Sequence, residues 1–282
     1  MKGNKAQALV VTLLIVLTLA VLAINTAHSV SIGLRLASYS QDRLSAFCAA
    51  KSSLSLALRR LKDDPDAAVR ADEKSWKVVD EEGKINVNHA GRELLIALFE
   101  EYSINRPDET ADALLIWRGD KPDADGIYLA AGYPCKKSPL AVFEELACVP
   151  WLDRQAIEPL REAVTLYGKG NVNLNTVSIR TLKVLCRGFA KKLGIDSQFA
   201  DSAAEKLMIA REGKGRLKDA NDLKLAPAGQ EETAVINELL KNTVYQSDNF
   251  SVEARGIVSR ISFTIKAVYD RASNHIIGWH ES

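Results

Sequence analysis

The densest group of side chains that could do chemistry is an acidic loop at residues 120–126. It carries Asp120, Asp123 and Asp125 and ends in Gly126. Carboxylate oxygens close together on a turn suit Ca²⁺, although Lys121 stands where an EF-hand would begin with an acid. Two interpretations therefore stay open: a calcium site formed by the three aspartates, and a solvated acidic turn.

Signatures of enzyme chemistry are absent from the sequence. The four histidines are scattered, and none lies in an H-E-x-x-H or similar metal-binding spacing. There is also no G-x-S-x-G, no P-loop and no G-x-G-x-x-G. We therefore expect no enzymatic activity.

Cysteine chemistry depends on the compartment. Of the four cysteines, Cys135 and Cys148 are the pair closest in sequence. Outside the cytoplasm they could form a disulfide, whereas four free, buried thiols are the alternative. No spacing suggests a zinc site.

Asparagines mark an internal repeat. Asn86 and Asn88 occur in an N-x-N motif that returns as Asn173 and Asn175, and each copy continues into an apolar helix, a second helix and a closing segment that ends in leucine. Asparagine side chains bind neighbouring backbone amides at turns and helix starts, so we interpret the motif as structural. The repeat predicts two copies of one helical unit, at about residues 83–165 and 166–247.

These units resemble SAM or helix-hairpin-helix units, which suggests DNA binding as an alternative function. The glycine-rich hairpin that approaches phosphate is missing, because residues 103–107 and 194–197 occupy its place. A basic run (Arg211, Lys214, Arg216, Lys218) could contact a nucleic-acid backbone, but we interpret it as a solvated helix end.

The first structural element along the chain is an apolar stretch at residues 8–24, which has no charge, glycine or proline. Its length is at the lower limit of about 17 residues for a membrane-spanning helix. Lys2 and Lys5 precede it, and the next basic residue other than histidine is Arg35, so the N-terminus should be cytoplasmic. A cleaved signal, with a site near Ala23, and a simple anchor are two possible interpretations.

A third interpretation is a single long helix over residues 7–62. No proline occurs between Ala8 and Leu61, and apolar residues from Leu44 to Leu61 follow a seven-residue pattern. Polar residues and Pro65 end it. A long helix that is apolar in its first half and amphipathic in its second is typical of a scaffold rather than of a removable signal.

The remaining segments predict an α+β fold. Residues 76–84 are predicted to form a short strand followed by a turn. Alternation of apolar and polar residues at 250–258, 261–270 and 275–280 predicts three further strands in a meander. The small antiparallel sheet then comprises residues 63–82 and 248–282. The helical domain, residues 83–247, is an insertion into this sheet. A net charge of +1 argues against a general polyanion binder.

The whole pattern resembles the K-type minor pseudopilins of bacterial type II secretion. The resemblance rests on the order of five segments along the chain: 80–88 after Trp76, 114–118, 138–146, 173–176 and 279–281. It implies a type IV pilin-like fold, with a leader (residues 1–6) that prepilin peptidase removes between Ala6 and Gln7. The family usually has Gly before the cut, so Gly3 and Asn4 are the fallback.

The resemblance also implies a function. Most pilins carry Glu at the fifth mature position, where this chain has Val11, or Ala8 for the fallback; a subunit without it suits a position with no subunit ahead. The family is assigned to the filament tip with the I-type and J-type minor pseudopilins above the major pseudopilin. It is anchored in the inner membrane with its bulk in the periplasm, and it binds calcium, with no nucleic acid expected. The alternative is a membrane-anchored, competence-type DNA-binding protein.

Overall fold

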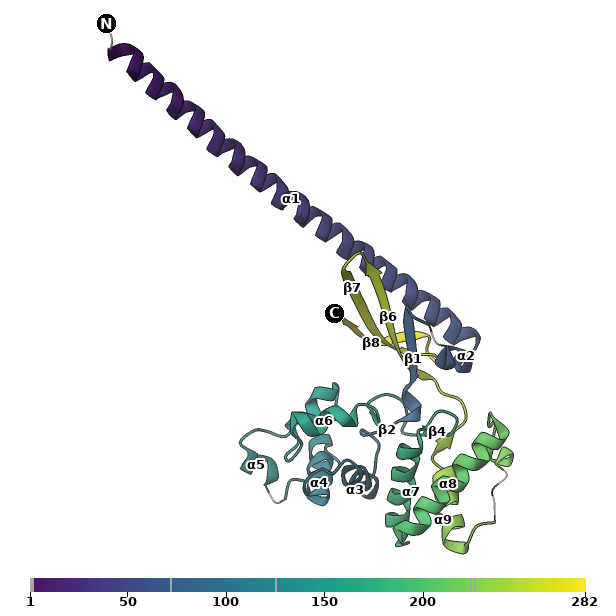
Figure 1. Cartoon of the computed structure of the whole chain (residues 1–282). Helices are drawn as coiled ribbons and strands as arrows, with labels where there is room; N and C mark the ends of the chain where they lie inside the picture. The colour runs from purple at the N-terminus through teal and green to yellow at the C-terminus, as the bar shows by residue number, and fades with distance from the viewer. Residues whose placement is uncertain (1–2, 72, 125, 224, 226) are drawn as a thin grey trace.

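A computed structural model describes residues 3–71, 73–124, 126–223, 225 and 227–282. One helix, α1 (Gly3–Asp63), runs unbroken from the N-terminus to the sheet, as the sequence predicts (Figure 1). Its 61 residues correspond to about 90 Å at ~1.5 Å per residue. A short helix, α2 (Pro65–Arg70), follows and turns the chain back toward the sheet.

The sheet has the strand order β1-β6-β7-β8 and is antiparallel throughout. Its strands are β1 (Trp76–Asp80), β6 (Asn249–Val258), β7 (Ile261–Asp270) and β8 (His275–Glu281). The predicted meander and the pairing of the early strand with it are confirmed. Both connections turn through a non-glycine residue with positive φ, Ser259 at 53° and Asn274 at 58°.

The second half of α1 covers one face of the sheet. Alternate residues of β6 and β7, such as Val252 and Ile265, point toward the helix and are buried. The helix presents Ala46 and Ala50 at the crossing, with Leu54 and Leu61 further along, and all four are buried. Small residues allow the helix and the sheet to approach closely, and the leucines then fill the remaining space.

The helical domain lies beyond the sheet, at the end of the molecule away from the N-terminus (Figure 1). It has its own hydrophobic core, separate from that between α1 and the sheet. Its helices are α3 (Arg92–Glu101), α4 (Pro107–Arg118), α5 (Ile127–Ala131), α6 (Arg154–Leu160), α7 (Ile179–Leu193), α8 (Ser197–Lys214) and α9 (Gln230–Leu240). Short 3-10 helices lie among them: η1 (Glu81–Gly83), η2 (Phe143–Cys148) and η3 (Ala220–Asp222).

Each helical unit is closed by a pair of two-residue parallel strands that the sequence did not predict. In the first unit β2 (Ile85–Asn86) pairs with β3 (Val164–Thr165), and in the second β4 (Val172–Asn173) pairs with β5 (Thr243–Val244). Each pair joins the beginning of a unit to its end. The same closure in both units confirms the internal repeat.

The two units pack together through α3 and α7. Gly188 of α7 makes this contact possible, because a Cβ atom there would lie 2.8 Å from the Cα of Leu94. A side chain at position 188 would therefore push the units apart.

Candidate functional site

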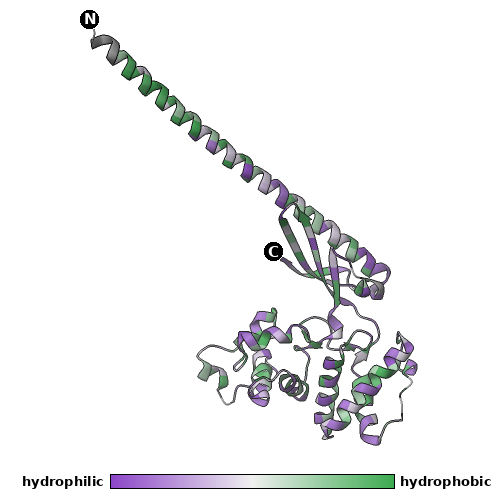
Figure 2. Cartoon of the chain, in the orientation of Figure 1, coloured by the Kyte–Doolittle hydropathy of each residue, from purple (hydrophilic) through white to green (hydrophobic). Residues whose placement is uncertain are grey.

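The exposed half of α1 is the feature of the structure that most needs a partner. Every residue from 8 to 41 is exposed, and Leu9 and Leu13 are 72% and 71% exposed. In Figure 2 the ribbon is largely hydrophobic over the first part of this half, which contains the apolar stretch at residues 8–24, and is mixed with hydrophilic residues beyond it. By length and composition it could cross a membrane. Such a surface is stable only when lipid or other apolar helices cover it.

The threonines of this half do not oppose burial in an apolar environment. The hydroxyl of Thr12 donates to the carbonyl of Leu9 at 2.9 Å, and that of Thr18 donates to Ile15 at 2.8 Å. Thr26 likewise donates to carbonyls within the helix. Because their donors are satisfied internally, these side chains can enter lipid or a helix bundle at little cost.

The exposed half contains no carboxylate. The first acidic residue of the chain is Asp42, and both Val11 and Ala8 are exposed apolar positions. The backbone is helical through Ala6 and Gln7, and through the fallback pair Gly3 and Asn4; the side chains of these four residues lie outside what the structure describes. Leader cleavage there stays a prediction.

A buried carboxylate joins the sheet to the helical domain. Asp80 ends β1, and its Oδ2 accepts hydrogen bonds from Asn173 Nδ2 at 2.9 Å and from the Ser247 hydroxyl at 2.7 Å. The Thr176 hydroxyl is a third donor to the same oxygen, at 2.5 Å. Burial raises the pKa of Asp80, and these donors partly offset that effect. The shared oxygen fixes the orientation of the helical domain relative to the sheet.

The repeated asparagines form the turns that the sequence predicts. Asn86 Oδ1 accepts from the backbone N–H of Asn88, and Asn173 Oδ1 accepts from that of Asn175, both at 2.9 Å. Such bonds stabilise the backbone two residues ahead. The first asparagine of each motif therefore shapes the loop before a helix, and the structural interpretation is confirmed.

The second asparagine of each motif clamps the closing segment of its unit. The Asn88 amide donates to the carbonyl of Leu140 at 3.0 Å and accepts from its N–H at 2.8 Å. Asn175 forms the same pair of bonds with Leu217, both at 2.9 Å, and also donates to Tyr245. A bidentate amide contact of this kind fixes a segment that has no regular secondary structure.

Replacing Asn175 with alanine should lower the free energy of unfolding by about 3 kcal/mol, because three hydrogen bonds of ~1 kcal/mol each are lost in a partly buried place. A thermal melt of the full chain in detergent measures this as a decrease of roughly 5–10 °C. Asn105→Ala is the matched control, because that asparagine is exposed. Equal melting temperatures for the two variants would contradict the clamp.

An arginine supports each asparagine loop from the neighbouring helix. Arg118 Nη1 donates to the carbonyl of Ala90 at 3.0 Å and also to that of Val87. Arg211 Nη1 makes the equivalent contacts, with Leu174 at 3.1 Å and Val177 at 2.7 Å. The interpretation of Arg211 as part of a solvated helix end is therefore wrong. Burial lowers the pKa of Arg211, and its donors serve the fold.

The remaining residues of the basic run are also poorly placed for a nucleic acid. Lys214 forms an ion pair with Asp222 at 3.0 Å, and Arg216 forms one with Asp66 near the start of α2. Within this run, whose four residues the structure describes, Lys218 is the one that is exposed and has no ion pair. The run therefore offers few free cations to a phosphate backbone.

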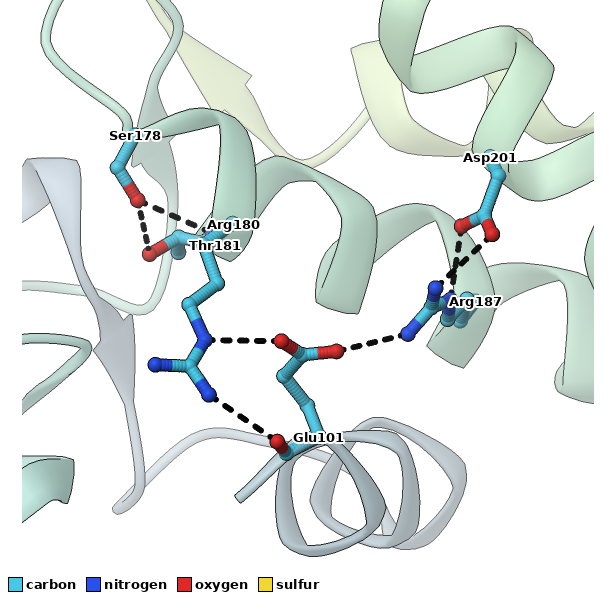
Figure 3. A network of polar contacts seen from close by, with 6 residues as sticks. All are labelled: Glu101, Ser178, Arg180, Thr181, Arg187 and Asp201. Carbon is cyan, nitrogen blue, oxygen red and sulfur yellow. Dashed lines mark hydrogen bonds and ion pairs between the residues drawn. The ribbon is translucent and has the colours of Figure 1, made fainter.

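An ion-pair network that no local sequence pattern indicates links the two helical units (Figure 3). Glu101, at the end of α3, accepts from Arg180 Nε and Arg187 Nη1, both at 2.8 Å. Arg187 continues to both oxygens of Asp201 in α8, at 2.7 and 2.9 Å. The network keeps α3, α7 and α8 in register, and networks of this kind stabilise more than isolated surface pairs do.

The described aspartates of the acidic loop already have partners. Asp120 forms an ion pair with Arg118, and Asp123 accepts from the backbone N–H groups of Ile127 at 2.7 Å and Tyr128 at 3.2 Å. Asp125 lies outside the described residues. Within the described parts of the chain, no three His, Cys, Asp or Glu side chains converge as a metal site. The geometry of Asp120 and Asp123 is thus that of an ion pair and a helix cap, and calcium binding stays a prediction.

Calcium binding by this loop can be tested by thermal melting. If the three aspartates bind Ca²⁺, millimolar calcium should raise the melting temperature of the full chain, because a ligand that binds only the folded state stabilises it. The increase should disappear in Asp125→Asn, which removes one of the three carboxylates and keeps Asp120 and Asp123. Absence of any shift at millimolar calcium would contradict the prediction.

The predicted disulfide also stays a prediction. Cys135 and Cys148 are free thiols in the structure, and Cys135 Sγ donates to the carbonyl of Ile116 at 3.1 Å. Burial, and with it the proximity of both cysteines, raises the pKa of the Tyr128 hydroxyl, so the two thiols belong to one region of the helical domain. Thiol titration of the unfolded, unreduced protein should count two thiols if the pair is oxidised, whereas Cys135→Ser should then expose Cys148 and give three. A count of four in the natural protein would contradict the pairing.

Together, the long helix, the sheet that it covers and the exposed apolar half define a type IV pilin-like fold with a helical insertion. No family model matches the sequence, and no curated protein matches it. Among solved structures, this chain is similar to a chain in the crystal structure of the GspK–GspI–GspJ complex from the enterotoxigenic Escherichia coli type 2 secretion system. The TM-score is 0.63 at 16% sequence identity, and the match covers 88% of this chain and 99% of the other.

At this identity the match shows the fold. It extends over nearly the whole of the matching chain and 88% of this one, so most of the fold of this chain is shared. The resemblance to K-type minor pseudopilins that the sequence predicts is confirmed at the level of the fold.

Proposed function

We propose that this protein is a minor pseudopilin of the K type, a non-enzymatic subunit at the tip of the type II secretion pseudopilus. In this proposal it helps to initiate assembly and limits growth of the filament during protein export. The observation that carries the proposal is the combination of an exposed half of α1 without a carboxylate and a large helical domain beyond the sheet. The fold match to a chain of the GspK–GspI–GspJ complex supports it.

The proposed tip position follows from charge. In pilin-like filaments a carboxylate near the start of the helix is thought to neutralise the terminal amine of the subunit ahead. This chain has none before Asp42, so a terminal amine ahead of it would stay uncompensated in an apolar core. A position with no subunit ahead avoids that cost.

The proposed route to this position uses the membrane. The exposed half of α1 anchors the subunit in the inner membrane, with Lys2 and Lys5 on the cytoplasmic side and the sheet and helical domain in the periplasm. Prepilin peptidase removes the leader, and the I-type and J-type minor pseudopilins and the major pseudopilin are the expected partners. Calcium is the one expected cofactor.

N-terminal sequencing of the mature protein from membranes tests this proposal. A start at Gln7, or at Asn4 for the fallback cut, supports processing by prepilin peptidase, and methylation of that residue would strengthen the support. A start after Ala23 would show cleavage as a secretory signal and would overturn the proposal. Co-purification with two other minor pseudopilins is the second expected result.

DNA binding is the alternative that the repeat architecture raises. It is disfavoured by the contacts of Arg211, which donates to two backbone carbonyls, and by the ion pairs of Lys214 and Arg216. Retention of duplex DNA by the full chain at moderate salt, lost on Lys214→Ala and Lys218→Ala, would favour the alternative function.

A further inference from the structure

Strand β8 is an open edge of the sheet. It pairs only with β7, and all of its residues except Gly278 are exposed. The opposite edge differs, because β1 contacts α2 and ends at the buried Asp80. Of the two edges of this sheet, β8 is therefore the one available to another chain.

The register shows which backbone groups of β8 face outward. Ser282 and Thr264 exchange two backbone hydrogen bonds, at 3.0 and 2.8 Å. In an antiparallel pair such bonded positions alternate with positions whose N–H and C=O point away. His280, opposite Lys266, is therefore bonded to β7, whereas the N–H and C=O groups of Trp279 and Glu281 point toward the open edge. Groups at this spacing match the backbone of another extended strand.

The side chains of β8 leave this edge unprotected. Ile276, Ile277 and Trp279 are 42%, 49% and 46% exposed. The strand has no lysine, arginine or proline, which are the residues that usually prevent pairing at an edge. Its one carboxylate, Glu281, accepts a hydrogen bond from Trp279 Nε1 at 2.8 Å. Exposed apolar side chains beside open backbone groups favour an apolar strand as the occupant.

We propose that β8 binds an extended, apolar-rich strand of another pilin-like subunit, which continues the sheet across the subunit boundary. The proposal rests on the proposed function, because that function supplies the neighbouring subunit. The occupant is a strand because the outward groups of Trp279 and Glu281 are matched only by an extended backbone. Three exposed apolar side chains on one short strand select apolar rather than charged residues opposite them.

Proline substitution at one outward position tests the proposal. Glu281→Pro removes an N–H that points to the open edge and leaves the bonds to β7 in place; proline is tolerated on edge strands. Glu281→Ala is the matched control, because both variants lose the carboxylate but only the proline loses the N–H. The full chain in detergent is titrated with the I-type and J-type minor pseudopilins of the same secretion system, and melting temperatures verify that both variants fold.

We expect Glu281→Pro to weaken binding about fivefold to tenfold, because one backbone hydrogen bond to the bound strand is lost. Glu281→Ala should bind within about twofold of the natural protein. If both variants bound equally and the natural protein bound well, the proposed role of β8 would be overturned and the proposed function would stand. Failure of the natural protein to bind either pseudopilin would instead contradict the proposed function. Self-association of the natural protein that Glu281→Pro abolishes would show a second copy at the edge and would also overturn the proposal.

Discussion

Replacing Gly256 with alanine should lower the free energy of unfolding by about 3 kcal/mol, the upper range for forcing an extra carbon into a packed interior. Gly256 lies in β6, directly under α1. An added Cβ would lie 2.0 Å from the carbonyl oxygen of Ala46 and 2.5 Å from the backbone N of Ala50. Both are backbone atoms of a continuous helix, so no side-chain rotation can relieve the contact and the helix must move away from the sheet.

The expected consequence extends along the crossing. The alanines that face the sheet, Ala46, Ala50 and Ala57, are fully buried, so α1 and β6 are already in close contact. Displacing the helix at Gly256 would open gaps beside Leu54 and Leu61 and forfeit part of their dispersion contacts. The position of the exposed half of α1 relative to the helical domain would change as well.

Thermal denaturation of the full chain in detergent, followed by limited proteolysis of α1, measures the effect of Gly256→Ala. Gly213→Ala is the matched control: Gly213 lies within α8, and an added Cβ meets nothing within 4 Å. Because alanine favours helix, this control should raise stability by about 0.5–1 kcal/mol. If the two alanine variants changed stability in the same direction, the close approach at Gly256 would not limit packing.

Features set by local periodicity could be predicted from the sequence. The long helix followed from an unbroken run without proline, the meander from strict alternation around residues 261–270, and the two helical units from the repeated asparagines. In each case the signal lies within a few residues of the element, because helix and strand patterns reflect which side of a segment is buried. The exposed half of α1 belongs to the long helix, so it could also be predicted from the sequence.

Features that depend on distant segments could not be predicted. Each two-residue strand that closes a unit pairs with a segment about as far away as the unit is long, and two residues carry no periodicity. Glu101 and Arg180 meet across the two units and have no shared local signal. Arg211 belongs to a sequence that looks like a basic helix end, yet tertiary contacts bury its guanidinium against Leu174 and Val177. Only the packed structure separates such a residue from a free cation.

Substituting arginine at both Leu14 and Leu17 should release the protein from the membrane. These leucines are 60% and 63% exposed and lie in the apolar stretch at residues 8–24. An arginine near the centre of a membrane-spanning helix costs about 3 kcal/mol on insertion scales, so the double variant loses about 6 kcal/mol of insertion free energy. A stretch at the lower limit of spanning length has little excess hydrophobicity to offset such a loss. Alkaline extraction of isolated membranes measures the fraction that remains bound.

The double variant Leu34→Arg and Leu36→Arg separates membrane insertion from general effects of charge on α1. These leucines are 67% and 64% exposed on the same helix, but they lie beyond the apolar stretch and flank Arg35. Arginines at this level can reach water or lipid headgroups, so we expect this control to remain in the membrane pellet. If both double variants were extracted equally, added charge at either level of the helix would weaken retention in the membrane. If neither were extracted, residues 8–24 would not be the anchor, and their exposed apolar surface would need cover from protein alone.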